Sequence, residues 1–398
     1  MSSTSALIID AIRTPGGRRE GNLSGWHPVD LAATVLSALT TRSNLDPGLV
    51  DDVIMGCVTQ VGHQAFNIGR SAVLAAGFPE QVPATTVDRQ CGSSQQSVHF
   101  AAQGVIAGAY DIAVAAGVEV MSTTPMGASK TAGSYVYGPL LRKRYKTIGG
   151  LVPQGISAEM IADRWNLTRE ELDTYGARSQ QYAARARDSG RFDAEILPVA
   201  VRRRDKQTDE VFADGTLTSA DEGIRPETTL EMLATLKPAF KEGGKITAGT
   251  SSQICDGSAA VLIASERAAA RHNLRPRARV HTFALAGVDP VSMLTGPIPA
   301  TQQALKKAGL SVDDIDVFEV NEAFASVILA WEKEIHPDME RVNVNGGAIA
   351  LGHPLGASGA KLMATMLNEL ERCGGRYGLQ TMCEGGGMAN ATIIERIS

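Results

Sequence analysis

The sequence predicts an α/β protein made of two repeated halves, with a long insertion in the first half. Three observations support this prediction. Through the first 120 residues, short apolar segments typical of buried strands alternate with segments of helical periodicity. The composition then turns polar and glycine-rich, and remains so to about residue 245. The last third repeats the pattern of the first at an offset of roughly 265 residues, as an internal duplication does.

The first half reads as strands and helices in alternation. Residues 6–12 are apolar almost throughout, which suits a strand in a sheet covered on both faces. Apolar residues recur at helical spacing over residues 28–39, and a second helix is predicted over residues 67–76. Residues 53–58 and 112–116 are short and apolar, and we expect both to be buried strands.

Residues 121–245 are interpreted as an inserted loop domain. Charged helical stretches cover residues 158–165 and 169–188, and residues 202–223 are polar. The first half is therefore predicted to comprise residues 1–120 plus 246–272. The second half is predicted to comprise residues 273–398.

The repeat predicts where chemistry-bearing residues of the two halves meet. Residues 310–320 resemble 45–58, residues 374–380 resemble 108–114, and Val344-Asn345 resembles Val87-Asp88. Superposing the halves places Cys383 just past the strand equivalent to residues 112–116. It also places the loop at residues 346–353 in the position of the turn at Cys91.

Composition excludes several function classes. The 398 residues carry a net charge of -5 and a pI near 5.9, which argues against a general nucleic-acid binder. No apolar run is long enough to span a membrane, and the start has no signal-type core, so we expect a soluble, cytoplasmic protein without a membrane partner. The five cysteines are widely spaced, which indicates reduced thiols and no zinc site.

Cys91 is the first candidate for catalysis. Residues 85–87 read as a strand that leads into a turn, and an alanine-rich helical segment follows. At such a junction the free backbone N–H groups and the helix dipole favour a thiolate, so Cys91 is a candidate nucleophile. The alternative is a small buried hydrophobic residue, because free cysteine is among the most buried residue types.

Three segments of the second half stand out as well. Asn321 opens the stretch N-E-A-F-A after a strand, His353 lies between Gly352 and Pro354 in a glycine-rich run, and Cys383 precedes three glycines. Each has an ordinary alternative. Asn321 would cap a helix, His353 would be a hydrogen-bonded loop residue, and Cys383 would fill the core.

Taken together, these segments resemble the thiolase family. The resemblance rests on the Cys91 turn, N-E-A-F-A at 321–325, G-H-P at 352–354, C-x-G-G-G at 383–387 and T-A-G-T-S-S-Q at 247–253, and it covers essentially the whole chain. It implies the thiolase fold, with two βαβαβαββ halves in α/β/α/β/α layers. The related ketoacyl synthases would carry two catalytic histidines and lack the second cysteine.

The resemblance also implies residue roles. Cys91 would attack the ketone of a 3-ketoacyl-CoA and hold the acyl group, with His353 accepting its proton. Cys383 would donate a proton to the departing acetyl-CoA carbanion. His353 and a water held by Asn321 would form one oxyanion hole, and the backbone N–H groups of Cys91 and Gly385 the other.

Coenzyme A is implied as substrate, with no permanently bound cofactor and no metal. By resemblance, Arg225 would lie against adenine and Ser252 would hydrogen-bond the pantetheine arm. The basic clusters at 142–146 and 202–204 could also meet phosphate, although a solvated surface is the commoner role of such runs. A homodimer or homotetramer is implied by resemblance as well.

The pattern is most similar to degradative 3-ketoacyl-CoA thiolases, in particular actinobacterial ones associated with sterol side-chain breakdown. Gln253 and the pair Gln95-Gln96 favour this type. Two departures bear on the substrate pocket: Ser94 replaces a usual glycine, and Gln154 lies where short-chain members often have Met. We expect a medium, long or bulky acyl group. A biosynthetic acetoacetyl-CoA thiolase, another condensing synthase and a non-catalytic acyl-CoA or lipid-binding relative are the alternatives.

Overall fold

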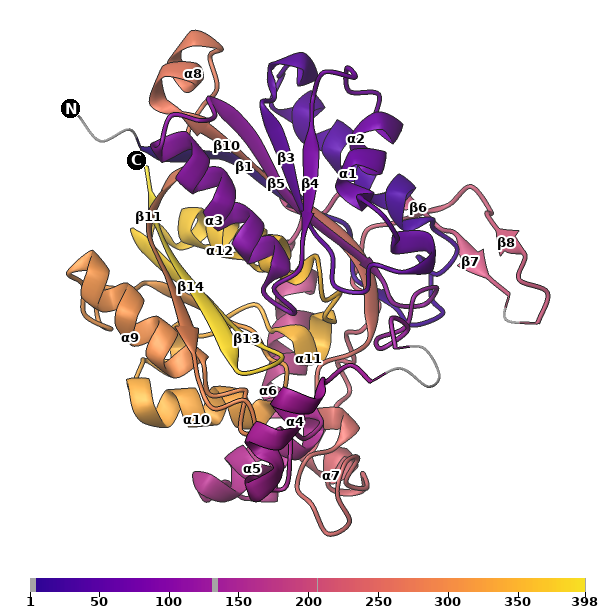
Figure 1. Cartoon of the computed structure of the whole chain (residues 1–398), viewed down its shortest axis with the longest axis vertical. Coiled ribbons are helices and arrows are strands. Elements are labelled where there is room, and N and C mark those ends of the chain that lie inside the picture. The colour runs from indigo at the N-terminus through magenta and orange to yellow at the C-terminus, as the bar shows by residue number, and fades with distance from the viewer. Residues whose placement is uncertain (1–4, 131–134, 206, 398) are drawn as a thin grey trace.

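The computed structural model describes residues 5–130, 135–205 and 207–397. Within these ranges ten strands form one large sheet in the order β12-β13-β14-β11-β1-β10-β5-β3-β4, with β2 paired to β10 (Figure 1). Its strands are β1 (Ala6–Arg13), β2 (Gly17–Arg18), β3 (Asp52–Gly56), β4 (Ala84–Val87), β5 (Ile112–Val120), β10 (Cys255–Ser265), β11 (Ala278–Gly287), β12 (Val317–Val320), β13 (Tyr377–Glu384) and β14 (Met388–Arg396).

The two halves repeat one topology, as the internal duplication in the sequence predicts. In the first half β3 pairs in parallel with β4 and β5, and β5 pairs antiparallel with β10. In the second half β12 pairs in parallel with β13, and β13 antiparallel with β14. The strand expected in place of β4 is reduced to an isolated bridge between Phe318 and Val342. The halves are joined where Leu7 and Ile8 of β1 pair with Arg279 and Ala278 of β11.

Helices lie outside both parts of the sheet and between them (Figure 1). These are α1 (Pro28–Arg42) and α2 (Ile68–Ala75) on the first half, α9 (Pro297–Ala308) and α10 (Ala325–Ile335) on the second, and α3 (Ser93–Ile106) and α12 (Ser358–Cys373) in the middle. Three apolar clusters fill the spaces between these layers. Nearly all of α12 is buried, which fits its place between two layers of strands.

The insertion leaves the sheet after β5 and returns at β10. Its helices are α4 (Pro139–Tyr145), α5 (Gln154–Arg164), α6 (Arg169–Asp188) and α7 (Leu230–Ala234), so the expected helix over residues 169–188 has the predicted bounds. The polar stretch at 202–223 forms parts of two small strand pairs, β6 (Val199–Ala200) with β9 (Leu217–Thr218) and β7 (Arg203–Arg204) with β8 (Val211–Phe212). Its boundaries as a separate domain stay a prediction.

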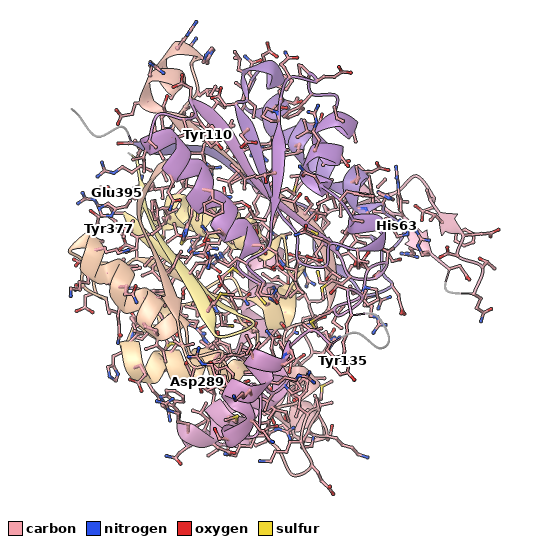
Figure 2. All side chains as sticks on the ribbon, viewed as in Figure 1. His63, Tyr110, Tyr135, Asp289, Tyr377 and Glu395 are labelled. Carbon is pink, nitrogen blue, oxygen red and sulfur yellow. The ribbon has the colours of Figure 1, made fainter. Side chains whose placement is uncertain are left out.

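The turn between β13 and β14 brings the second cysteine to the centre of the molecule. Tyr377 and Glu395, both labelled in Figure 2, are paired at the far end of these strands. Cys383 pairs with Ala389 at the opposite end, beside the turn. This end of the hairpin faces the start of α3 and the insertion (Figure 1).

Candidate active site

A tight turn between β4 and α3 presents Cys91. Gln90 has a positive φ of 49°, and the Ser93 hydroxyl accepts from the Arg89 N–H at 2.9 Å while donating to the Gln90 carbonyl at 2.6 Å. Cys91 lies one residue before Gly92, the N-cap of α3. The predicted strand, turn and helix are all present. Cys91 is only 6% exposed, so the turn buries it almost completely.

The expectation that the helix start makes Cys91 a thiolate is wrong. Burial raises the pKa of Cys91 to about 12, and the nearby Glu384 raises it further. Hydrogen bonds to the sulfur from its own backbone N–H, the Gln154 side chain and the Gly385 N–H oppose this rise without cancelling it. The resting nucleophile is therefore a neutral thiol that must lose its proton as it attacks.

The repeat predicted Cys383 just past a strand. The structure instead places it inside β13, one residue before the strand ends. The predicted strand covered too few residues, because the equivalent strand β5 continues to Val120. The Cys383 thiol is 1% exposed, and burial raises its pKa well above 9. A negative charge on Cys91 would raise the pKa of Cys383 further, so ionisation of one thiol opposes ionisation of the other. The structure thus brings together the cysteines that the sequence keeps 292 positions apart.

His353 has a defined orientation. Its Nδ1 lies 2.5 Å from the Ser358 hydroxyl, and that hydroxyl donates to the Pro354 carbonyl at 2.9 Å. Because the Ser358 hydroxyl donates its hydrogen to Pro354, it can only accept from His353. The imidazole proton is therefore on Nδ1, and Nε2 has a free lone pair. Burial and Lys361 lower the pKa of His353 to about 3, which keeps the ring neutral. Nε2 is thus free to accept a proton.

Asn321 faces the same histidine. Its amide Nδ2 lies 3.5 Å from His353 Nε2, and its side chain is 1% exposed. The alternative of a helix cap is wrong, since Phe324 is the residue that precedes α10. Among the described residues, Asn321 Oδ1 has no hydrogen-bond partner.

The start of α3 packs directly on the start of α12, the helix that follows the His353 loop. The Ala360 N–H donates to the Ser94 hydroxyl at 2.9 Å, and a Cβ on Gly359 would lie 2.1 Å from the Gln95 backbone nitrogen. Ser94 therefore bridges the two central helices. Its departure from the family pattern is explained by this contact.

The segment at 247–253 supports two loops of the second half, the one before α10 and the one that carries His353. The His353 N–H donates to the Gln253 carbonyl at 3.0 Å, and the Ser252 N–H donates to the Ala323 carbonyl at 3.0 Å. The Gln253 side chain donates to the carbonyl of Ile349 at 2.7 Å. Gln95 likewise donates to the Thr392 hydroxyl at 2.7 Å. Both glutamines thus have structural contacts.

Gly385 and Gln154 flank the nucleophile. A Cβ on Gly385 would lie 3.1 Å from Gln90 Oε1 and 3.3 Å from Gln154 Nε2. Gln154 was noted in the sequence for pocket polarity, but its contact with Cys91 was not foreseen. The roles of Ser358 and Glu384 were missed as well. Glu384 lies within C-x-G-G-G, where the motif was a usable signal, whereas Ser358 lies four residues after G-H-P.

The two residues expected to hold CoA lie on neighbouring segments, because the Gln253 side chain donates to the Gly223 carbonyl at 2.9 Å. Ser252 is half-buried beside Ala323, whereas Arg225 is exposed and its backbone N–H donates to Gln180 at 2.7 Å. The basic cluster at 202–204 is engaged on the surface: Arg202 stacks on Trp26, Arg203 bonds Asn22, and Arg204 pairs with Asp209. This cluster therefore has structural partners.

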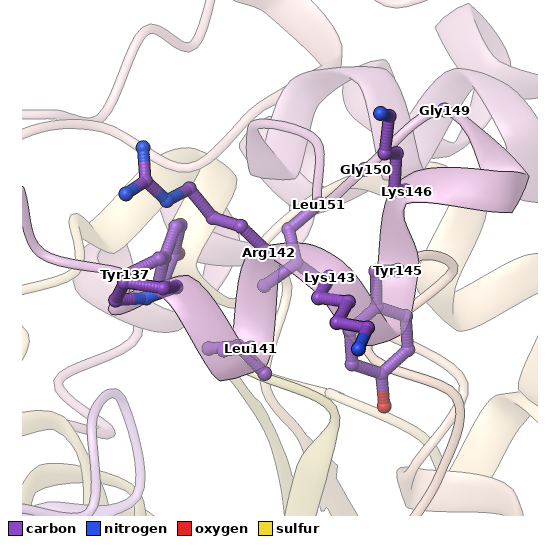
Figure 3. Close-up of a pocket in the computed structure, with 10 residues that line it drawn as sticks. Tyr137, Leu141, Arg142, Lys143, Tyr145, Lys146, Gly149, Gly150 and Leu151 are labelled. Atoms are coloured by element: carbon purple, nitrogen blue, oxygen red, sulfur yellow. The ribbon is translucent and has the colours of Figure 1, made fainter.

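The basic cluster at residues 142–146 lines a pocket of about 710 Å³ (Figure 3). Its walls include Tyr137, Leu141, Arg142, Lys143, Tyr145 and Lys146. In the close-up, Lys143 and Tyr145 extend side by side, while Lys146 points the other way. The segment ends at Leu151, three residues before Gln154. The pocket thus combines aromatic and aliphatic walls with cationic groups.

The described residues hold neither a metal-ion cluster nor a membrane span. No group of three or more His, Cys, Asp or Glu side chains there is arranged to hold a metal ion. No helix in the same ranges has the length and apolar character to cross a membrane.

Comparisons with known proteins agree over almost the whole chain. The description "Thiolase, N-terminal domain" matches residues 6–267, and "Thiolase, C-terminal domain" matches residues 274–396. Steroid 3-ketoacyl-CoA thiolase FadA6 of Mycobacterium tuberculosis is 52% identical over 399 residues, which covers 99% of this chain and 95% of that protein. The crystal structure of human mitochondrial 3-ketoacyl-CoA thiolase has a TM-score of 0.88, 38% identity and full coverage of both chains. That of Bacillus anthracis acetyl-CoA acetyltransferase has a TM-score of 0.87 and 37% identity, with 99% of each chain covered.

Proposed function

Because the chain belongs to the thiolase family, we propose that it cleaves 3-ketoacyl-CoA in the degradative direction through an acyl group held on Cys91. As a thiolase it is an acetyl-CoA C-acyltransferase and takes CoA as a substrate. The observation that carries the proposal is that two buried thiols, Cys91 and Cys383, interact, with the N–H of Gly385, two residues after Cys383, bonded to the Cys91 sulfur. Transfer of an acyl group needs one nucleophile, whereas breaking a carbon–carbon bond also needs an acid for the carbanion.

In the first half-reaction Cys91 Sγ attacks the ketone carbon. His353 Nε2 takes the thiol proton, since the bond to Ser358 keeps the Nε2 lone pair available. Collapse of the adduct breaks the bond between the α and β carbons. The electron pair leaves with acetyl-CoA, which takes a proton from Cys383. The products are acetyl-CoA, a thioester on Cys91, a protonated His353 and a Cys383 thiolate.

In the second half-reaction the sulfur of a free CoA attacks the thioester and releases the shortened acyl-CoA. The CoA thiol brings one proton and His353 holds another. These two protons restore both cysteines to thiols. The neutral resting state that burial imposes on Cys91, Cys383 and His353 is therefore the state to which the cycle returns.

Two sets of donors would hold the oxyanions. The Gly385 N–H already points at the Cys91 sulfur, as does the N–H of Cys91 itself, and an oxygen on the attacked carbon would lie in their reach. His353 Nε2–H, once formed, and a water on Asn321 would receive the thioester oxygen of the acetyl unit. These assignments of Asn321 and Gly385 are part of the proposal.

CoA is proposed to lie along the insertion. Ser252 is suited to the pantetheine arm because its backbone is fixed next to Ala323 of the site. Arg225, exposed on the same part of the chain, would lie against adenine. Arg142, Lys143 and Lys146 around the pocket would offer charge to phosphate, or the aromatic and aliphatic walls there would take the acyl group.

A bulky or medium-chain acyl group is the proposed substrate. The name of the relative at 52% identity contains "Steroid 3-ketoacyl-CoA thiolase", and the pocket of about 710 Å³ next to Gln154 offers room. We expect acetoacetyl-CoA to be a poor substrate in a kcat/KM series of 3-ketoacyl-CoA thioesters. A clear preference for acetoacetyl-CoA would favour the biosynthetic alternative.

The proposed assembly is a homodimer or homotetramer in the cytoplasm. The sheet ends at β4, which in the described residues has a neighbour on one side alone, so its outer edge is free to pair. Phe66, 94% exposed, lies in the loop before α2, which packs on this strand. The free thiols of all five cysteines suit a reducing compartment.

Mass spectrometry tests the mechanism. Incubation with a 3-ketoacyl-CoA without free CoA should add one acyl group to Cys91, and Cys91→Ala should abolish the addition. Cys383→Ala should lower labelling from the 3-ketoacyl-CoA by about 10²- to 10⁴-fold. The same variant should still accept an acyl group from a saturated acyl-CoA, because that transfer forms no carbanion. An unlabelled wild-type chain would support a binding protein instead.

A further inference from the structure

A small cavity lies beside Asn321 and Gly352, the residue before His353, with both polar and apolar walls. Its walls include the side chains of Glu319, Asn321, Ser358, Lys361 and Thr365. The space open to the centre of a water molecule is about 10 Å³. That is room for about one ordered water, and the polar walls supply the partners that a buried water needs.

Two groups in these walls lack hydrogen-bond partners. Glu319 is fully buried, and within the described residues neither of its carboxyl oxygens is bonded. Asn321 Oδ1 is buried and unpartnered in the same way. Side chains two positions apart on an extended strand point to the same face, so Glu319 and Asn321 face the cavity together. A buried unpaired polar group is costly, so three such oxygens around one cavity point to a shared partner.

Glu319 is suited to act as a donor. Burial raises its pKa well above 4.5, and Glu195, Glu322 and Glu369 raise it further, while Lys361 opposes them. A carboxyl group that stays protonated carries one O–H donor. Asn321 Oδ1 is an acceptor, and a single water can accept from Glu319 and donate to Asn321.

Lys361 completes the walls. Its ammonium group donates to the carbonyls of Leu351 at 2.6 Å and Gly352 at 3.1 Å, directly before His353. These bonds use two of its three N–H donors. The third is available to the same water.

We propose that Glu319 is a positioning residue which, as an uncharged acid, binds a water molecule in this cavity and through it fixes the amide of Asn321. With Oδ1 turned to the water, Nδ2 is held toward His353, as the 3.5 Å separation shows. An Asn321 amide free to rotate would turn its oxygen toward His353 and the water of the oxyanion hole part of the time. The inference rests on the proposed role of Asn321 in the oxyanion hole.

A high-resolution crystal structure of the full chain tests the water directly. Density for one water within hydrogen-bond distance of Glu319 and Asn321 Oδ1 is expected, and an empty or differently bonded cavity would overturn the inference. The same crystals of Glu319→Leu should lack the water and show two orientations of Asn321. This measurement does not depend on activity, so its failure is distinct from failure of the proposed function.

Kinetics test the coupling. Glu319→Leu is expected to lower kcat of thiolysis by about 10- to 100-fold with little change in the KM for CoA, and Glu319→Gln, also neutral and able to donate, by less than about threefold. In an Asn321→Ala background, Glu319→Leu should have almost no further effect on kcat. Equal losses in both backgrounds would mean that Glu319 supports the fold alone. Equal losses for Gln and Leu would exclude an uncharged donor.

Discussion

Glu119 and Glu384 occupy the same place in the two halves, at the end of β5 and of β13, 265 positions apart. Glu119 accepts four hydrogen bonds: from the N–H groups of Val58, Thr59 and Gly356 and from Gln64, at 2.7 to 3.0 Å. Glu384 is also fully buried, yet neither of its oxygens has a partner within the described residues. The Glu119 carboxyl group is thus fully hydrogen-bonded, whereas that of Glu384, next to the nucleophile, has no partner among the described residues.

The difference shows that equivalent glutamates of the two halves have different roles. One stabilises the fold, and the other leaves a backbone donor free for the reaction. Gly356, whose N–H is bound by Glu119, is the counterpart of Cys91 by the same offset of 265. If Glu384 bound the Cys91 N–H in the equivalent way, that donor would be lost to substrate. The second carboxyl instead packs against Gly92, where a Cβ would lie 2.1 Å from its Oε1. The open arrangement keeps the Cys91 N–H for an oxyanion.

The largest effect is expected from Glu119→Gln. An amide has one acceptor oxygen where the carboxylate has two, so about half of the four donors would face an NH₂ group. The free energy of unfolding should fall by about 3 kcal/mol or more, measured by urea denaturation at pH 7. Glu384→Gln is the matched control and should cost less than about 1 kcal/mol. Equal costs would refute the contrast between the two carboxyl groups.

Gly92→Ala should have the next largest effect. Gly92 has a negative φ of -87°, so glycine is needed there for space and not for backbone freedom. The added methyl group would displace Glu384 and the turn, and a shift of this kind near a nucleophile lowers kcat by about 10- to 100-fold. Ala357 is the counterpart in the second half and carries this methyl group already. Ala357→Gly is therefore the mild control.

Removing the carboxyl group should relieve the clash. In a Glu384→Ala background, Gly92→Ala is expected to lower kcat by less than about threefold. The shortest contact is then removed, and only Asn390 Nδ2, 2.7 Å from the added Cβ, has to shift. A full loss in that background would place the cause elsewhere in the turn.

The smallest effect is expected from Glu384→Gln on the reactivity of Cys91. Burial raises the pKa of Glu384 to about 8, with Asp88 adding to the rise and Arg89 opposing it. Below that pH the group is neutral, and above it the negative charge raises the pKa of Cys91. Alkylation of Cys91 by iodoacetamide should therefore differ little from wild type at pH 6 to 7 and be faster in the variant above pH 8. Peptide mass spectrometry separates Cys91 from the exposed Cys373.

The raised pKa of Glu384 also makes the free energy of unfolding depend on pH. Since the folded pKa of about 8 lies above the ordinary 4.5, Glu384 stabilises the folded state fully below pH 4.5, and this contribution is lost as the pH rises toward 8. The stability of Glu384→Gln relative to wild type should increase over that window. A constant difference would contradict the raised pKa.

Local pattern predicted most of the fold. Strands such as β1 are apolar on both faces, and α6 has a capping box at Thr168 and Glu171 that fixes its start. The bridge at Val342 that replaces a strand could not be predicted, because Val344-Asn345 has the same local character as Val87-Asp88. Pairing depends there on neighbours distant in sequence.

For the site, the motifs supplied the residues and the structure supplied their electrostatics. Cys91, His353, Asn321 and Cys383 were all chosen from the sequence, but the helix argument misjudged the Cys91 thiol. Desolvation in the closed site outweighs the helix dipole, and burial of this depth is set by contacts between the halves. Gln154 and Ser358 act through geometry that no spacing within one motif reveals.

The short junction between β1 and β11 bears on how the chain is made on the ribosome. β1 is among the first elements synthesised, yet it pairs with β10, which begins at Cys255, and with β11, which begins at Ala278. At roughly 5 to 20 residues per second, this apolar strand waits about 10 to 50 seconds for its first neighbour. During translation the nascent chain therefore exposes an apolar, aggregation-prone strand whose partner strands have not yet been synthesised. We expect ribosome-associated chaperones to shield it until β10 and β11 pair with it.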